Sequence, residues 1–209
     1  MGQKISDYTY RLDSDCTLLK LDEQILQHCD RFDCGVDDLN DFFSNDALAY
    51  EKDLMGKTYC WLDNRNDTKI VAMVTLANAS IQTSHLQNNP KRLLHKNIAH
   101  CKQGRTYPAV LIGRLGVNSA FQGPAFRIGA QIMDFIKDWF SSADNKTGCR
   151  FVLVDAINND HTRSYYERNG FKPLFPRVSD EKDFYGIKTH EELRTRIYYF
   201  DLLSNDIPQ

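Results

Sequence analysis

Apolar residues in the first half of the chain repeat first with a helical period and then with a strand-like pattern. From Val36 to Leu54 they recur at intervals close to one face of an amphipathic helix. Residues 58–63 and 68–80 are rich in β-branched, aromatic and other apolar types, and the polar residues 64–67 between them are typical of a hairpin turn. We therefore expect a helix over 36–54, followed by two antiparallel strands.

A strand, a glycine-containing loop and a second helix are predicted next. Residues 108–117 form an apolar strand pattern that contains Gly113 and Gly116, and glycines inside a strand often mark a bulge or a close approach to the backbone. Apolar residues with helical spacing predict a helix over 128–139. Residues 150–157 are nearly all apolar, as in a strand that is covered on both faces.

The last third of the chain predicts a short helix over 160–168, ended by Gly170, and a final strand over 195–203. Parallel neighbouring strands joined by a helix form a right-handed crossover, which places both helix N-termini at one edge of the sheet. We expect a binding cleft at that edge. Exposed N–H groups at a helix start favour a phosphate, and Gly123 and Gly129 leave room for one to approach.

The length and composition of the chain fit one soluble domain over residues 1–209. Its 209 residues are 42% hydrophobic, 11% aromatic and 26% charged, which is close to the globular average and excludes collagen-like, disordered and coiled-coil chains. The longest nearly unbroken apolar run, 70–77, is much shorter than the roughly 20 residues needed to cross a bilayer. The polar N-terminus lacks the apolar stretch of a secretory signal. We expect a cytoplasmic protein with no membrane partner.

Charge and metal-binding residue types narrow the choice of ligand. The net charge of -2 lacks the global positive field of non-specific nucleic-acid binders. Residues 84–105 carry five lysines or arginines and no acidic residue, so they form either solvated surface or a local site for an anionic acceptor. His85, His95, His100 and Cys101 follow no recognised metal-ligand spacing, so we expect no metal. The six cysteines form no C-x-x-C pair and are expected to be free, mostly buried thiols.

Five short runs occur in a fixed order. They are Leu115-Gly116-Val117, Phe121-Gln122-Gly123, Arg127-Ile128-Gly129-Ala130, Asn158-Asn159 and Tyr166-Glu167-Arg168-Asn169-Gly170-Phe171. Together they resemble the GNAT superfamily of acyl-CoA N-acyltransferases, over about residues 32–203. The run Phe32-x-Cys34-Gly35-x-x-x-Leu39-x-x-Phe42 also resembles the opening of a GNAT branch that includes toxins acetylating aminoacyl-tRNA. The resemblance implies a single GNAT-like domain over 1–209 with a mixed α+β fold. In that fold a central, mostly antiparallel sheet contains one splayed parallel strand pair and is flanked by helices.

The resemblance also implies acetyl-CoA as co-substrate, with no metal, and a role for each matching position. The end of the 108–117 strand should splay from the 150–157 strand and bond the pantetheine arm, together with Asn159. Backbone N–H groups of the loop that enters the next helix should hold the pyrophosphate. Tyr166 should stand near the thioester sulfur as the catalytic acid, with Tyr165 as the adjacent alternative. The expected cofactor-binding residues are Leu115, Gly116, Val117, Gln122, Gly123, Arg127, Ile128, Gly129, Ala130 and Asn159.

The phosphate loop departs from the family pattern Gln/Arg-x-x-Gly-x-Gly/Ala. Aligning the helix start puts Pro124 at the leading Gln/Arg position and Arg127 at the first glycine. Alternatively, Gln122-Gly123 is the original start, and residues 124–126 lengthen the loop. Arg127 then either gains a phosphate contact or blocks the pocket.

The chemistry implied is the transfer of an acetyl group to a primary amine by direct attack. Thioester aminolysis needs a neutral amine, donors for the developing oxyanion and an acid for the departing thiolate. The resemblance implies that Tyr166 supplies the acid, and the amide of Val117 or its neighbour is expected to face the acyl oxygen. The strand 108–117 carries no carboxylate, so deprotonation goes through a water, through a group from 78–80, or precedes binding.

The acceptor stays open at this point. It is a small-molecule or peptide amine or, as the alternative, an aminoacyl-tRNA, which the basic segment 84–105 favours and the overall acidity opposes. The remaining alternative for the function is a non-catalytic acyl-CoA-binding module. The sequence also leaves open whether the chain forms a homodimer.

Overall fold

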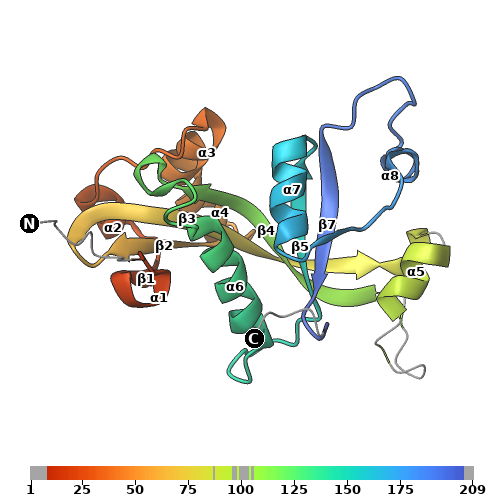
Figure 1. Cartoon of the computed structure of the whole chain (residues 1–209), viewed down its shortest axis with the longest axis horizontal. Coiled ribbons are helices and arrows are strands. Elements are labelled where there is room, and N and C mark those ends of the chain that lie inside the picture. The colour runs from red at the N-terminus through yellow and green to blue at the C-terminus, as the bar shows by residue number, and fades with distance from the viewer. Residues whose placement is uncertain (1–8, 87, 96–97, 99–103, 105, 205–209) are drawn as a thin grey trace, which may run out of the picture. The chain divides into compact units, whose positions relative to one another are not determined.

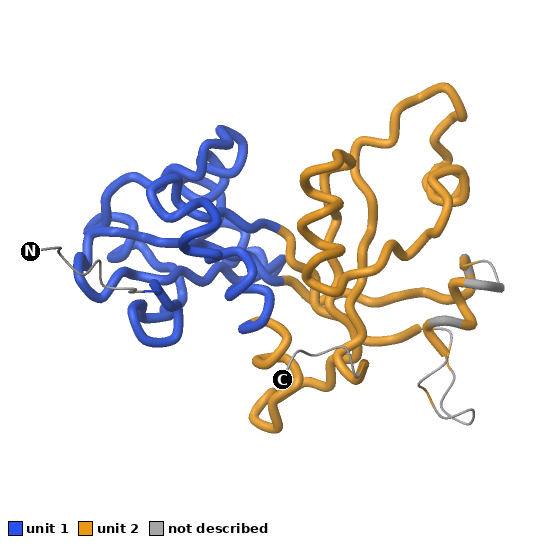
Figure 2. The backbone as a smooth tube through the Cα atoms, viewed as in Figure 1, with its two compact units in different colours: residues 1–76, 114–135 blue, residues 77–113, 136–209 orange. Residues whose placement is uncertain are grey.

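The structure, a computed structural model, describes residues 9–86, 88–95, 98, 104 and 106–204. The chain forms two compact units, one made of residues 1–76 and 114–135 and the other of residues 77–113 and 136–209 (Figure 2). Strands β3 and β4 and helix α6 each run from one unit into the other, so no linker separates the units. The expectation of a single domain stays a prediction.

Figure 1 shows the helices and strands along the chain. The helices are α1 (Leu12–Asp15), α2 (Glu23–His28), α3 (Asp37–Asp41), α4 (Ala47–Lys52), α5 (Asn88–His95), α6 (Ile128–Ser141), α7 (Asp160–Arg168) and α8 (Val178–Tyr185). The strands are β1 (Cys16–Lys20), β2 (Lys57–Asp63), β3 (Asn66–Gln82), β4 (Thr106–Val117), β5 (Phe151–Ile157), β6 (Lys172–Pro173) and β7 (Thr195–Asp201). They form a mixed sheet in the order β1-β2-β3-β4-β5-β7-β6, in which β4 and β5 pair in parallel. The predicted α+β class is confirmed.

A π-helical turn interrupts the long helix predicted over 36–54. Helical structure continues from α3 through the π-helical residues Phe42–Asp46 into α4. A π turn accommodates one extra residue, and both Phe43 (0% exposed) and Ala47 (2%) lie in the core. Leu54, the predicted end, instead lies beyond the helix with a φ of 58° and a side chain that is 92% exposed.

The predicted hairpin is confirmed, and its second strand is longer than expected. β2 pairs antiparallel with β3, with Thr58 opposite Thr75 and their hydroxyl oxygens 2.8 Å apart. Residues 70–76 of β3 are all buried, so this part of the strand is covered on both faces. β1, which the apolar pattern did not predict, pairs antiparallel with β2.

Helix α8 lies in a segment that the sequence predicts only as a polar excursion. A polar contact fixes it, because Glu181 is 0% exposed and accepts hydrogen bonds from Arg196 Nε at 2.9 Å and from the Ile197 N–H at 2.7 Å. Arg196 Nη2 also donates to the Phe175 carbonyl at 2.5 Å. The helices α1, α2 and α5 are likewise absent from the prediction, because each is too short to show a clear period.

The described cysteines are free thiols, and Cys16, Cys34 and Cys60 are buried. Burial raises the pKa of Cys60 to about 12 and that of Cys16 to about 11, so neither is a thiolate at neutral pH. Cys101 lies outside the described residues. Among the helices of the described chain, none combines the length and the apolar character needed to cross a membrane.

Candidate functional site

The parallel ladder between β4 and β5 ends part-way along both strands. Its register begins with Ala109 opposite Phe151 and stops at Ile112 opposite Val154 within the described residues. β5 nevertheless continues to Ile157, and β4 continues for five residues beyond the last pair. Strand edges without a ladder partner keep N–H and C=O groups that can bond an extended ligand.

Gly116 is needed for packing inside the first unit. A Cβ at this position would lie 3.0 Å from a ring carbon of Phe32 and 3.1 Å from one of Phe43, so a larger residue would require these rings to shift. The backbone of β4 therefore lies directly against these two rings. Leu115 and Val117 alternate with Gly116 along the strand and are half-buried on its other side.

The side-chain amide of Gln122, a predicted cofactor residue, is bound by the protein. Its Nε2 donates to the Cys34 carbonyl at 2.9 Å and to the Val117 carbonyl at 2.8 Å. Ser119 adds two bonds to the same neighbouring loop, because its N–H and its hydroxyl both donate to the Asp33 carbonyl, at 2.8 and 3.0 Å. The end of β4 and the loop after it are thereby fixed to the loop at residues 33–35. Direct contact between Gln122 and a cofactor stays a prediction.

A buried asparagine organises that neighbouring loop. Asn40, 8% exposed, accepts from the Cys34 N–H through Oδ1 and donates through Nδ2 to Asp33 Oδ1, both at 2.8 Å. Asp33 Oδ1 also accepts from the Gly35 N–H at 2.8 Å, and these bonds hold the pKa of Asp33 below its ordinary value. Sequence reasoning linked this run to a GNAT branch but missed its role of holding the loop after β4.

The loop that enters α6 carries unpaired backbone donors. The Arg127 N–H donates to the Gly123 carbonyl at 3.2 Å, which closes a turn over residues 124–126. Gly123 has a φ of 107° and Arg127 a φ of 50°, so both adopt left-handed conformations. In the part of the chain that the structure describes, the N–H groups of Ala125, Phe126 and Ile128 donate to no acceptor. Such groups at a helix start can bind phosphate oxygens.

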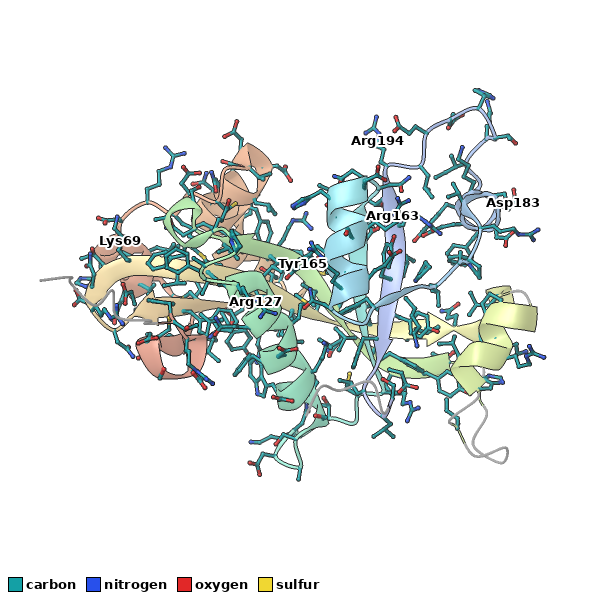
Figure 3. The ribbon with its side chains drawn as sticks, viewed as in Figure 1. Lys69, Arg127, Arg163, Tyr165, Asp183 and Arg194 are labelled. Atoms are coloured by element: carbon teal, nitrogen blue, oxygen red, sulfur yellow. The ribbon has the colours of Figure 1, made fainter. Side chains whose placement is uncertain are left out.

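Aromatic rings pack together at this loop, and one of them comes from the N-terminal part of the chain. Tyr10, Phe121 and Phe126 form a mutual cluster with ring centroids 5.3 to 5.9 Å apart. Gln131 of α6 donates through Nε2 to the Tyr10 carbonyl at 3.0 Å and to the Phe126 carbonyl at 2.9 Å. These contacts hold the loop in place and leave the N–H groups of Ala125, Phe126 and Ile128 without an acceptor in the described part of the chain. The exposed Arg127 side chain stands at the start of α6 (Figure 3).

In the second unit, Asn159 begins α7. Its Oδ1 accepts from the Thr162 N–H at 2.8 Å, so the residue is the N-cap of the helix. Its side chain is exposed, and Nδ2 donates to no acceptor among the described residues. Asn158 fixes the chain just before the helix, because its N–H donates to the Arg194 carbonyl at 2.9 Å and its Nδ2 to the Leu193 carbonyl at 2.8 Å.

Tyr166 combines a tightly packed ring with an unpaired hydroxyl. The residue is 7% exposed, and its ring centroid lies 5.0 Å from that of Tyr165, 5.5 Å from Phe171 and 6.2 Å from Tyr198. The hydroxyl makes no hydrogen bond within the described residues. Burial raises the pKa of Tyr166 to about 12, so the hydroxyl keeps its proton at neutral pH. Tyr165 is half-buried on the same helix (Figure 3).

Two predicted features fall partly outside the described residues. In the basic segment 84–105, Lys91 and Arg92 lie on α5, whereas the other basic side chains of the segment are not described. His100 and Cys101 are likewise not described. Among the described residues, no group of three histidine, cysteine or acidic side chains is placed to hold a metal ion.

No family model matches the chain, but several solved structures are similar over most of its length. A tyrosine-to-phenylalanine mutant of KacT matches with a TM-score of 0.65 and 17% identity, covering 90% of this chain and 96% of that one. A tyrosine-to-phenylalanine mutant of the AtaT toxin, bound to acetyl-CoA and the C-terminus of its antitoxin AtaR, matches with a TM-score of 0.60 and 19% identity, covering 90% and 94%. AtaT complexed with acetyl-methionyl-tRNAfMet matches with a TM-score of 0.59 and 20% identity, covering 90% and 95%. The predicted fold is thereby confirmed: the chain has the GNAT fold that these proteins share.

Proposed function

We propose that this protein is an N-acetyltransferase that moves an acetyl group from acetyl-CoA to a primary amine. The observation that carries the proposal is the ladder that ends, within the described residues, at Ile112–Val154, because β5 continues beyond the last pair to Ile157. A peptide-like pantetheine arm bonds a strand edge of this kind in the way an added strand does. The similarity to an AtaT structure that holds acetyl-CoA supports the same donor.

The donor contacts divide between residues that bond the arm and residues that bond the phosphates. Leu115, Gly116 and Val117 bond the pantetheine arm through their backbone. Asn159 is a further contact to the arm through Nδ2, which donates to no acceptor among the described residues. The N–H groups of Ala125, Phe126 and Ile128 bind the pyrophosphate, because they donate to no acceptor among the described residues. The guanidinium of Arg127 pairs with a phosphate oxygen. The remaining expected contacts are those of Gly123, Ile128, Gly129 and Ala130.

The chemical step needs an acid at the leaving sulfur. The neutral amine attacks the thioester carbonyl carbon, the C–N bond forms and the C–S bond breaks. Tyr166 gives its proton to the departing sulfur, and the proton shed by the amine nitrogen restores the tyrosine through water. Because its pKa lies at about 12, Tyr166 is fully protonated at neutral pH and is not a permanent charge beside the thioester.

Aminoacyl-tRNA is the acceptor that the similar structures favour, since AtaT was solved with acetyl-methionyl-tRNAfMet. A small-molecule or peptide amine is the second candidate. The decisive experiment incubates the protein with acetyl-CoA and, in parallel, a panel of amines and a panel of charged tRNAs, and detects acetylated product by mass spectrometry. We expect acetyl-CoA to bind and one class of amine to gain an acetyl group. Failure to bind acetyl-CoA under titration contradicts the proposal.

Salt dependence separates the two acceptor classes. Contacts to phosphates release counterions, so the affinity for tRNA should fall steeply, roughly tenfold or more, when salt rises from about 50 to about 200 mM. The affinity for a small amine should change little over that range. A flat salt response with charged tRNA would exclude tRNA as the acceptor.

Replacement of Gln122 with alanine should weaken acetyl-CoA binding about tenfold. The variant loses the bonds to the Cys34 and Val117 carbonyls, and two hydrogen bonds contribute on the order of 1–3 kcal/mol to holding the loop. Isothermal titration calorimetry with acetyl-CoA measures the change. The control is Gln24→Ala, which removes an exposed glutamine from α2 and should leave the affinity unchanged. Equal affinities in the two variants would show that the clamp does not support the donor site.

A further inference from the structure

The end of β5 presents an unpaired carboxylate beside an exposed apolar side chain. Side chains alternate along a strand, so Asp155 and Ile157 share a face with the buried Phe151 and Leu153. Asp155 follows directly after the last residue that pairs with β4. Within the described residues its carboxylate forms no hydrogen bond or ion pair, and Ile157 is 61% exposed.

Helix α8 carries a tyrosine, Tyr185, whose phenol is affected by the charge of this carboxylate. Ile197 is the register partner of Asp155 on β7, and its N–H donates to Glu181 of α8 at 2.7 Å. Tyr185 lies one helical turn after Glu181 and so shares its face of α8. Burial, followed by the charges of Asp155 and Glu181, raises the pKa of Tyr185 to about 12, which agrees with a short separation between the carboxylate and the phenol.

The surroundings of Asp155 are both negative and apolar. Glu181 forms an ion pair with Arg196. Asp155, in contrast, forms no ion pair within the described residues. Tyr185 is 47% exposed and the adjacent Phe184 43% exposed, with their ring centroids 5.0 Å apart. A carboxylate attracts an ammonium group, an aromatic face adds cation–π attraction, and exposed apolar side chains cover an apolar substituent.

Asp155 and Tyr166 lie on opposite faces of the β5–β7 pair. Tyr166 packs against Tyr198, the register partner of Val154, and Val154 and Asp155 are consecutive residues of one strand. Figure 1 shows α7, which carries Tyr166, and α8 on either side of β7. A thioester near Tyr166 and an amine near Asp155 would therefore approach each other from opposite faces at the part of β5 that has left the β4 ladder.

We propose that Asp155, Ile157 and Tyr185 form the acceptor site, and that its ligand is a primary ammonium group next to an apolar substituent, as in an amino acid ester or amide with an apolar side chain. This inference rests on the proposed acetyltransferase function. Asp155 binds the ammonium, which loses one proton to water before the neutral amine attacks the thioester. Ile157 and Tyr185 contact the substituent. The site differs from the donor contacts, which come from β4, the loop before α6 and Asn159.

The test uses leucinamide as the acceptor and glycinamide as its counterpart without a side chain. In Asp155→Asn we expect the KM for leucinamide to rise about tenfold or more, while the KM for acetyl-CoA stays within about twofold. Asp183→Asn, on the exposed surface of α8, makes the same change in net charge and should leave both values unchanged (Figure 3). Equal KM values for leucinamide in the two variants would overturn the assignment.

A binding measurement keeps the test independent of turnover. Leucinamide is titrated into the protein saturated with coenzyme A and followed by calorimetry, and we expect binding that Asp155→Asn weakens about tenfold. Ile157→Ser should remove the preference for leucinamide over glycinamide. Absence of leucinamide binding to the wild-type protein, or binding unchanged in Asp155→Asn, would refute the acceptor site. Absence of acetyl-CoA binding would instead refute the proposed function.

Discussion

Replacement of Tyr166 with phenylalanine is expected to reduce turnover about a hundredfold or more, while the affinity for acetyl-CoA changes less than about twofold. The substitution removes only the hydroxyl. The ring contacts with Phe171 and Tyr198 stay in place, so the helix and its cap should not move. Steady-state kinetics with the acceptor identified by mass spectrometry, together with calorimetry for acetyl-CoA, measures both quantities.

Tyr165→Phe is the matched control, because it removes the same atom from the adjacent, half-buried tyrosine. It should retain most of the activity. If Tyr165→Phe is inactive and Tyr166→Phe is active, the acid is Tyr165. If the wild-type protein binds acetyl-CoA but acetylates no amine, the chain is an acyl-CoA-binding module. Since the pKa of Tyr166 is raised to about 12, turnover should not decline from loss of this proton between about pH 7 and pH 10.

Replacement of Arg196 with methionine should lower the free energy of unfolding by about 3–5 kcal/mol. The substitution leaves the carboxylate of Glu181, which is 0% exposed, without its positive partner, and it removes the donor to the Phe175 carbonyl. Urea denaturation followed by circular dichroism measures the loss. A loss below about 1 kcal/mol would mean that Glu181 is less buried than described.

A second variant and the pH dependence identify the buried charge as the cause. Glu181→Gln added to Arg196→Met removes the charge but keeps an acceptor for the Ile197 N–H, so the double variant should regain part of the loss. Burial raises the pKa of Glu181 even beside Arg196, and removing Arg196 raises it further. The native state of Arg196→Met then binds a proton at a higher pH than the unfolded chain does. Its stability should therefore rise as pH falls from about 8 to about 5.

Local patterns were sufficient to predict the elements that bury an apolar face. The helix before β2, the β2–β3 hairpin and the β4–α6–β5 crossover follow from periodicity and turn residues. Helix α8 could not be predicted, because its buried contact is the ionic pair of Glu181 with Arg196, 15 residues away in the chain. The π turn could not be predicted either. It inserts one residue, and this changes the spacing of the apolar residues too little to be distinguished from a continuous helix.

The candidate site shows the same division between local and long-range information. The positions of Asn159 and Tyr166 on α7 follow from their spacing within one short run, and the structure describes them as the N-cap and a buried side chain of that helix. The Gln122 side chain instead meets the Cys34 carbonyl, 88 residues away in the chain, which no local pattern contains. Asp155 was not predicted as a site residue for a related reason. A single acidic residue in an apolar strand points to a site only once the strand pairing and the position of α8 are known.

The outer edge of β7 determines whether copies of the chain can aggregate through strand pairing when a residue that covers this edge is substituted. Ile197 uses its carbonyl to accept from the Leu174 N–H at 2.8 Å and its N–H to donate to Glu181, so this part of the edge offers nothing to another molecule. Among the described residues, β6 pairs with two residues of the same edge. Loss of the Glu181 side chain would leave the Ile197 N–H without its acceptor. This N–H could then pair with a strand of another molecule, so such variants should precipitate as they unfold.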